Sequence, residues 1–339
     1  MNSHSDTQAA ALEQLVPCDL DAGSIFSGQA TGTKIKGFEA PSPFTPAVNR
    51  NYLFHEQARD LIVWFLYDKD PLYVFGPLGS GKTSLIKELA ARLNYPVFEV
   101  TGHSRLEFPE LIGHLAVRDG GMFFQYGPLA LALKYGGLFL LNEIDLLDPS
   151  TAAGLNSILD GSPLCVPENG GEIIAPNPMF RFAATANTNG TEDTTGLYRG
   201  TLRQNCAFMD RFWLCEIGYP KPEFEQRLLE KTSPELPSDL RTRMVEFANE
   251  VRRLFVGSST DSESRPDTVL DITFSTRTLL RWARLTVMFQ PLSRQGISPI
   301  LHSLERAVGF RAAAESRTFL QELAQRIFNT DYQPTELQS

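Results

Sequence analysis

The chain has 339 residues, of which 42% are hydrophobic and 21% charged, and its formal net charge is −9. This composition is typical of a globular protein of one or two domains. The acidic balance disfavours binding to nucleic acid or to an anionic membrane surface, and no apolar run is long enough to cross a bilayer. The four cysteines lack the CxxC spacing of a metal site, and the N-terminus lacks the basic and apolar segments of a secretory signal. We therefore expect a cytoplasmic protein with reduced thiols.

The first 40 residues are rich in small and polar side chains without sustained periodicity, and we expect a flexible or loosely docked N-terminal arm there. A helical pattern extends from Leu53 to Tyr67. Short apolar runs then predict buried parallel strands at 71–75, 96–100, 138–141, 180–185 and 212–217. Helices are expected between them, at 83–93 and 148–159. This alternation predicts an α/β fold in which helices flank a parallel sheet.

The strand pattern stops after Pro220, and the rest of the chain is predicted to be helical, at 222–232, 240–255, 275–289, 299–313 and 318–328. A polar stretch at 257–266 separates two of these helices. We therefore divide the chain into the arm at 1–40, an α/β domain at 41–219, and a small all-helical domain with a C-terminal tail at 220–339.

A phosphate-binding loop follows the first predicted strand, with the sequence Gly76-Pro-Leu-Gly-Ser-Gly-Lys-Thr83. In a loop of this form the glycines let backbone amides turn toward phosphates, the lysine meets the outer phosphates, and the threonine hydroxyl binds Mg²⁺. The strand before the loop and the helix after it are the context that this chemistry needs. We therefore expect ATP and Mg²⁺ as cofactors, with the nucleotide held by Gly76, Pro77, Gly79, Ser80, Gly81, Lys82, Thr83 and Ser84.

A second set of polar residues follows the strand at 138–141, in the run Asn142-Glu-Ile-Asp145. Carboxylates at the end of such a strand, downstream of a phosphate loop, lie beside the Mg²⁺ and the attacking water, and Glu143 is expected to polarise that water. The Asn142 amide oxygen can contact Mg²⁺ through a bound water but brings no negative charge. We therefore expect Asn142→Asp to match or raise the rate of hydrolysis, and Asp145 is a candidate source of the missing charge.

Asn187 ends the next predicted strand, in the run Ala184-Thr-Ala-Asn187. An asparagine there can orient the water between the γ-phosphate and Glu143. The alternative is an asparagine that only caps a loop, which is the commoner role of this residue at a strand end.

These three motifs, in this order, resemble those of AAA+ ATPases. The runs Asp193-Thr-Thr-Gly-Leu-Tyr198 and Met209-Asp-Arg-Phe212 narrow the resemblance to the MoxR-like group. Within that group the chain is most similar to the cobaltochelatase ATPase-subunit (CobS) type. The similar region extends from Tyr52 to Tyr219, and the family pattern has an aspartate where this chain has Asn142.

The resemblance implies a P-loop AAA+ core followed by a helical lid, and it assigns roles to three residues. Asn187 is implied to be the first sensor, Arg211 an arginine finger that reaches the neighbouring subunit's site, and Arg277 the second sensor. For each arginine the alternative is an exposed helix residue without a partner. The resemblance also implies two inserts that face a central pore, at 113–127 and 165–178. Two aromatic residues of the first insert either grip a client or fill the core of a small hairpin, namely Phe123 and Phe124.

The family pattern further implies self-assembly into a ring, expected to be a hexamer, and a partner protein with a von Willebrand A domain. The expected function is ATP hydrolysis coupled to remodelling or activation of that partner. Two alternatives stay open. One is the motor subunit of a cobalt chelatase. The other is an ATP-binding scaffold with little hydrolysis, which the neutral Asn142 favours.

Overall fold

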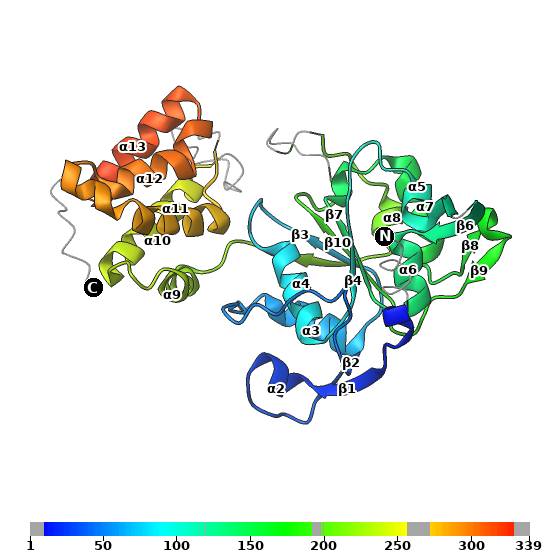
Figure 1. Cartoon of the computed structure of the whole chain (residues 1–339). Helices are drawn as coiled ribbons and strands as arrows, with labels where there is room; N and C mark the ends of the chain where they lie inside the picture. Colours follow the sequence, from blue (N-terminus) through cyan, green and yellow to red (C-terminus); the bar gives the residue numbers. More distant parts are fainter. Residues whose placement is uncertain (1–9, 119, 192–197, 199, 256–271, 329–339) are drawn as a thin grey trace. The chain divides into compact units, whose positions relative to one another are not determined.

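The computed structural model describes residues 10–118, 120–191, 198, 200–255 and 272–328 (Figure 1). These residues form two compact units. The first contains the described residues up to Gly76 and those between Lys82 and Ile217, whereas the second contains Pro77–Gly81 and the described residues from Gly218 onward. The family-specific residues 193–197 and the polar stretch at 257–266 lie outside the described residues.

A five-stranded parallel sheet forms the centre of the first unit, with the strand order β11–β3–β10–β7–β4. All five strands were predicted from apolar runs of the sequence, and the α/β fold is confirmed. Every residue of β7 is buried, as expected for a strand within a parallel sheet that is covered on both faces. In chain order the strands are β3 (Leu72–Phe75), β4 (Val97–Thr101), β7 (Leu138–Asn142), β10 (Arg181–Ala186) and β11 (Trp213–Glu216).

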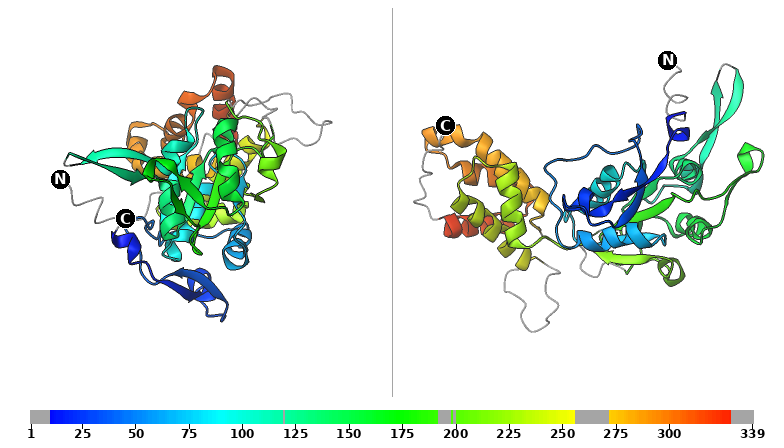
Figure 2. Two further views of the ribbon diagram at one scale, coloured as in Figure 1. Left: turned by 90° about the vertical axis from the view of Figure 1, so that its right-hand side faces the viewer. Right: turned by 90° about the horizontal axis from the view of Figure 1, so that it is seen from below.

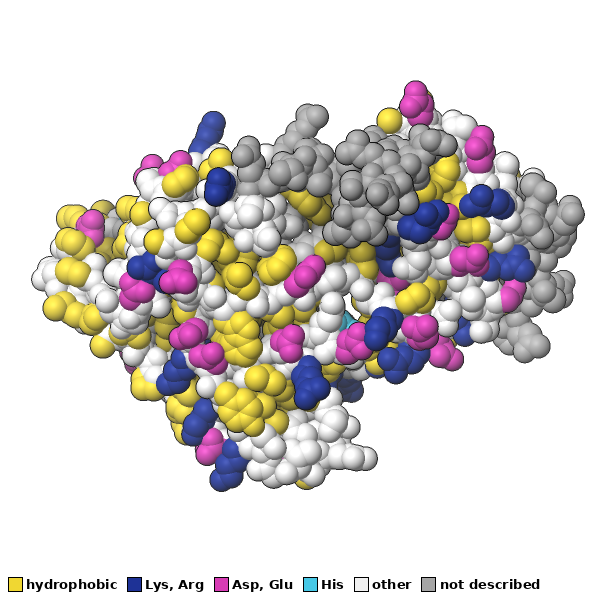
Figure 3. Space-filling model, turned by 180° about the vertical axis from the view of Figure 1, so that it is seen from behind, with side chains coloured by type: hydrophobic (Ala, Val, Ile, Leu, Met, Phe, Trp, Pro, Cys, Tyr) yellow, Lys and Arg dark blue, Asp and Glu magenta, His cyan; other side chains and the backbone are white. Residues whose placement is uncertain are grey.

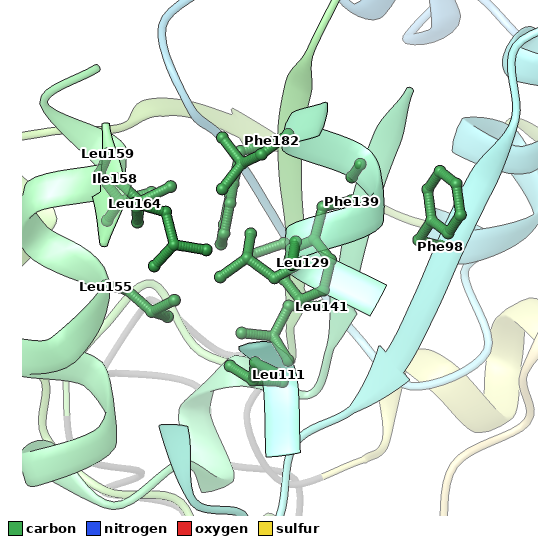
Figure 4. Close-up of a cluster of buried hydrophobic side chains, with 14 of the residues drawn as sticks. Phe98, Leu111, Leu129, Phe139, Leu141, Leu155, Ile158, Leu159, Leu164 and Phe182 are labelled. Atoms are coloured by element: carbon green, nitrogen blue, oxygen red, sulfur yellow. The ribbon is translucent and has the colours of Figure 1, made fainter. Parts of the chain in front are cut away.

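Helices cover the two faces of this sheet (Figure 1). Alternate side chains of β7 belong to different hydrophobic clusters, because successive residues of a strand point to opposite faces. Phe139 and Leu141 belong to the cluster drawn in Figure 4, and Leu138 and Leu140 belong to the cluster on the other face. The helices of this unit are α2 (Ala22–Phe26), α3 (Ala58–Tyr67), α4 (Lys82–Arg92), α5 (Phe108–Ile112), α6 (Pro128–Tyr135), η1 (Ile144–Leu146), α7 (Pro149–Leu159), η2 (Pro167–Asn169) and α8 (Cys206–Met209).

Antiparallel hairpins extend the first unit. One of them, β1–β2, lies in the segment that the sequence indicated as an arm, and it buries Ile35 and Phe38 in the same cluster as Leu138. The Phe38 ring lies 5.1 Å from the ring of Tyr95. The segment is therefore docked where the structure describes it, and the expected domain boundaries stay a prediction. The hairpins pair β1 (Pro17–Asp21) with β2 (Lys34–Phe38), β5 (Gly113–Arg118) with β6 (Gly121–Tyr126), and β8 (Leu164–Val166) with β9 (Glu172–Ile174).

The second unit is built from helices around its own core (Figure 2). The rings of Phe247, Phe274 and Trp282 pack together there, with centroid distances of 5.0 to 5.6 Å. A buried ion pair joins Arg252 Nη1 to Glu225 Oε2 at 2.7 Å. None of the helices in the described residues of either unit is long and apolar enough to span a membrane. The helices of this unit are α9 (Pro222–Thr232), α10 (Ser238–Arg253), α11 (Thr276–Met288), η3 (Gln290–Gln295), α12 (Pro299–Ala307), η4 (Gly309–Arg311) and α13 (Ala314–Phe328).

Candidate nucleotide site

The predicted phosphate loop joins β3 to α4, as the motif requires, because β3 ends at Phe75 and α4 begins at Lys82. Gly76 has a φ of 143°, and a Cβ there would lie 2.2 Å from the carbonyl oxygen of Ile217. Only glycine fits such a position. Within the loop, the Ser80 hydroxyl is buried and has no hydrogen-bond partner among the described residues. Unpaired buried hydroxyls are uncommon, and this one fits a loop whose ligand supplies the partner.

Lys82 connects the loop to the end of β10. Its side chain is buried, and Nζ donates hydrogen bonds to the Gly76 carbonyl oxygen at 2.7 Å and to Asn187 Oδ1 at 3.2 Å. The structure thus brings together the lysine of the phosphate loop and the asparagine predicted to act as a sensor. The other loop residues expected at the nucleotide are Pro77, Gly79 and Gly81, which are half-buried, and Ser84, which is exposed on α4.

Thr83 meets Asn142 at the end of β7. Thr83 Oγ1 donates to Asn142 Oδ1 at 2.7 Å, and Thr185 Oγ1 donates to the same oxygen at 3.0 Å. The other end of the amide, Nδ2, donates to Glu99 Oε1 at 2.8 Å. Hydroxyl and amide oxygens are among the ligands that suit Mg²⁺, so the Thr83 and Asn142 pair fits the predicted cation site.

Glu143 follows β7 directly and adopts a left-handed backbone conformation, with φ 55° and ψ 44°. This conformation is uncommon for residues other than glycine, and such residues concentrate at functional sites. The Glu143 side chain is half-exposed, and its carboxylate has no hydrogen-bond or ion-pair partner within the described residues. The carboxylate can therefore accept a proton from a water molecule.

Asp145 is fully buried and holds the segment that follows β10. Its Oδ2 accepts hydrogen bonds from the backbone N–H groups of Asn187 and Thr188, at 2.9 and 3.1 Å. Burial raises the pKa of the Asp145 carboxyl above its usual value, although these hydrogen bonds oppose the shift. Asp145 was a candidate source of negative charge at Asn142. In the structure it positions the Asn187 backbone, and the carboxylate in contact with Asn142 is that of Glu99.

Arg211 follows α8 and forms a bidentate ion pair with Asp160 of its own unit. Its Nε and Nη2 donate to the two carboxylate oxygens of Asp160, at 2.8 and 3.0 Å, and its Nη1 donates to the carbonyl oxygen of Ala207. Asp160 directly follows α7 and caps its C-terminus. The Arg211 side chain is one-quarter exposed, so Arg211 is a partnered residue at the surface of the unit.

Comparison with known proteins gives two adjoining matches. An AAA domain of the dynein-related subfamily matches residues 71–212, and a CbbQ/NirQ/NorQ C-terminal domain matches residues 225–327. The chain is a MoxR-type AAA ATPase. The family implies ATP binding and hydrolysis, and the resemblance found in the sequence is confirmed.

Individual relatives of this ATPase are similar at 28% identity. The aerobic cobaltochelatase subunit CobS of a Sinorhizobium species matches over 72% of this chain and 76% of its own length. The denitrification regulatory protein NirQ of Stutzerimonas stutzeri matches over 54% of this chain and 64% of its own length. Among solved structures, a RuvB variant of Thermotoga maritima superposes over 70% of this chain, with 14% identity and a TM-score of 0.44.

The two hairpins expected as inserts are present in the ATPase, as β5–β6 and β8–β9. They lie near each other: the Tyr126 hydroxyl at the end of β6 and Lys134 Nζ on α6 both donate hydrogen bonds to the Glu172 carboxylate on β9. Figure 2 shows that β5–β6 projects from the body of its unit. The aromatic residues of this hairpin differ in exposure: Phe124 belongs to the hydrophobic core, which supports the alternative of a core aromatic, and Phe123 is half-exposed.

Arg277 belongs to the second unit, in the first turn of α11, where Ser275 caps the helix. Its side chain is exposed, and within the described residues it has no hydrogen bond or ion pair. Its role as second sensor stays a prediction. Sequence reasoning did not find the contacts of Glu99 and Thr185 with Asn142. Glu99 belongs to no motif, Thr185 lies in the run that ends at Asn187 but was given no role there, and only the adjacency of β4, β7 and β10 brings both to Asn142.

Proposed function

We propose that this AAA ATPase binds ATP with Mg²⁺ at Lys82 and Thr83, hydrolyses it with Glu143, and uses the cycle to remodel or activate a partner protein. One arrangement carries the proposal. The two hydrogen bonds Lys82–Asn187 and Thr83–Asn142 converge beside Glu143, whose carboxylate is unpaired within the described residues.

Each residue of this arrangement has a chemical task. The Lys82 ammonium neutralises charge on the outer phosphates, and the Ser80 hydroxyl gains a partner when phosphate enters the loop. When bound at Thr83 and Asn142, Mg²⁺ neutralises charge on the phosphate oxygens. Glu143 accepts a proton from the attacking water, and Asn187 orients that water.

Assembly and partnership form the second part of the proposal. We infer a ring, expected to be a hexamer, in which Arg211 contributes to the site of a neighbouring subunit, and Arg277 acts as the second sensor. The expected partner carries a von Willebrand A domain, and the expected location is the cytoplasm, which the four free cysteines support. Acidic and basic side chains are interspersed on the face drawn in Figure 3, which favours a protein client over nucleic acid.

Two alternatives have support of their own. The similarity to CobS, which is named as a chelatase subunit, favours the motor subunit of a metal chelatase. The neutral Asn142, where the family pattern has an aspartate, favours an ATP-binding scaffold with little hydrolysis.

The nucleotide site is tested by two substitutions. Lys82→Ala should abolish ATP binding measured by calorimetry, because the buried ammonium that faces the phosphates is lost. Glu143→Gln should keep the affinity for ATP and lower turnover by at least about a hundredfold, since the amide cannot accept the proton. Unchanged affinity in Lys82→Ala would exclude this site, and a Glu143→Gln variant with normal turnover would exclude Glu143 as the base.

The client is tested by a pull-down with the Glu143→Gln variant, which should hold the ATP-bound state. We expect this variant to retain a protein with a von Willebrand A domain when ATP is present. When Lys82→Ala is used as the bait instead of Glu143→Gln, that protein should not be retained. Adding that protein should stimulate ATP turnover by the unsubstituted chain, whereas cobalt with a corrin precursor alone should not. Retention of a large chelatase subunit would favour the chelatase motor. If no protein is retained and basal turnover is already at its full rate, the result would count against both the remodelling function and the chelatase motor.

A further inference from the structure

Glu99 is a residue of the nucleotide site that no sequence motif identifies. It lies on β4 opposite Leu140 of β7, so its side chain shares a face of the sheet with Asn142. Glu99 Oε1 accepts the hydrogen bond from Asn142 Nδ2, and Glu99 Oε2 lies 2.6 Å from Lys87 Nζ. Lys87 follows Thr83 by one turn of α4, so one face of that helix meets both Asn142 and Glu99.

The two ends of the Asn142 amide differ in what they can bind. The oxygen accepts hydrogen bonds and can face a cation or a water bound to it, whereas the NH₂ group only donates. The hydroxyls of Thr83 and Thr185 do not discriminate between the two ends, because a hydroxyl both donates and accepts. The carboxylate of Glu99 only accepts. It therefore determines that NH₂ faces Glu99 and that the oxygen faces Thr83.

We propose that Glu99 is a positioning residue for the cation of the bound nucleotide: it fixes the Asn142 amide so that the oxygen, and not the NH₂ group, faces Mg²⁺. This inference rests on the proposed function, since it requires ATP with Mg²⁺ at Lys82 and Thr83. Without the Glu99 carboxylate the amide can turn over and present its NH₂ group, whose partial positive charge repels the cation.

An aspartate at position 142 would make Glu99 unnecessary. Both oxygens of a carboxylate accept hydrogen bonds, so either oxygen of an aspartate can face the cation. It would also place a second negative charge where Asn142 Nδ2 now contacts Glu99, and like charges in contact repel. The sequence alone predicts that Asn142→Asp matches or raises hydrolysis. The contact with Glu99 instead predicts that the full benefit of Asp appears only when Glu99 is also replaced.

The test isolates the contribution of Mg²⁺ to ATP binding by the full chain. Calorimetry gives the dissociation constant for ATP with EDTA and with Mg²⁺. The factor by which Mg²⁺ lowers this constant is called the Mg²⁺ gain. Glu99→Leu should lower this gain by about tenfold, the scale of one hydrogen bond to a charged group, and should leave the affinity in EDTA within about twofold. In the Asn142→Asp background, Glu99→Leu should leave the gain unchanged or raise it.

Glu250→Leu is the matched control, because it also removes a partly exposed glutamate from an ion pair, here with Arg253 at 2.9 Å in the second unit. This variant should keep the Mg²⁺ gain of the unsubstituted chain. A Glu99→Leu variant that also keeps it, or that loses it equally in the Asn142→Asp background, overturns the positioning role. A chain that binds no ATP at all overturns the proposed function instead, so the two failures are distinct.

Discussion

At the scale of single residues, the position of Glu143 depends on a neighbour without a side chain. The Gly102 N–H donates to the Asn142 carbonyl oxygen at 2.7 Å. A Cβ on Gly102 would lie 2.6 Å from the Glu143 carbonyl oxygen and 3.2 Å from that of Asn142. These obstacles are backbone atoms, which cannot turn aside as the end of a side chain can. A methyl group at position 102 must therefore displace the turn that carries Glu143.

We predict that Gly102→Ala separates binding from hydrolysis. A displacement of Glu143 by about 1 Å should lower turnover by about a hundredfold. The affinity for ATP measured with EDTA should change little, because Lys82 and Thr83 belong to α4 and not to this turn. Gly309→Ala is the control, since the atoms nearest to a Cβ there belong to the side-chain carboxylate of Glu305, at 3.0 to 3.2 Å, and not to the backbone. Equal turnover in the two variants would show that the Glu143 turn tolerates the shift.

At the scale of elements, the sequence predicts the sheet well because its central strands β3, β7 and β10 are buried on both faces. Such strands are continuous apolar runs, and β7 is the clearest of them. The N-terminal hairpin was not predicted, because β2 exposes alternate lysines and the hairpin therefore lacks a continuous apolar run. Its burial depends on distant partners: the Phe38 N–H bonds to the Leu93 carbonyl oxygen, and Asn94 Nδ2 donates to the Phe38 carbonyl oxygen.

One charged residue within a predicted strand also gains a physical explanation. The run Phe180-Arg-Phe182 is not part of the phosphate chemistry. In the structure Arg181 is buried at the start of β10. Its Nη2 donates to the carbonyl oxygen of Phe65 at 2.9 Å, and its Nη1 donates to that of Asp68. A cation that bonds the last carbonyl groups of a helix stabilises its C-terminus, so Arg181 ties β10 to the end of α3.

At the scale of the whole molecule, the proposed nucleotide site and the proposed arginine finger lie in different parts of one unit. Lys82, Thr83, Asn142, Glu143 and Asn187 all belong to the first unit, as does Arg211. Arg211 is held by Asp160 at the end of α7 and not by any of these residues. This arrangement suits an arginine that is presented to another copy of the chain. The sequence could suggest the finger from the family pattern, but its ion pair depends on the approach of α7 and α8.

We therefore predict complementation between two inactive variants. Lys82→Ala subunits cannot bind ATP but retain Arg211, and Arg211→Ala subunits retain the phosphate loop. Mixing them should restore a fraction of the turnover, because some intact loops then face intact arginines, and turnover by the unsubstituted chain should rise with protein concentration. The control mixes Arg211→Ala with the double variant Lys82→Ala and Arg211→Ala, which supplies no arginine and should stay inactive. If mixed assemblies form and turnover stays absent, Arg211 does not act between subunits.

The contact between Glu99 and Asn142 also constrains how such a site can change over evolutionary time. Starting from aspartate at position 142, a change to asparagine alone leaves an amide that can present either end. If glutamate is acquired first at position 99, its carboxylate lies next to that of the aspartate at position 142, and the two negative charges repel. The proposed role of Glu99 makes each single step unfavourable, and only the pair restores a defined site. Within this family, asparagine at the end of β7 should therefore be inherited together with a hydrogen-bond acceptor on β4, and the two positions should change together.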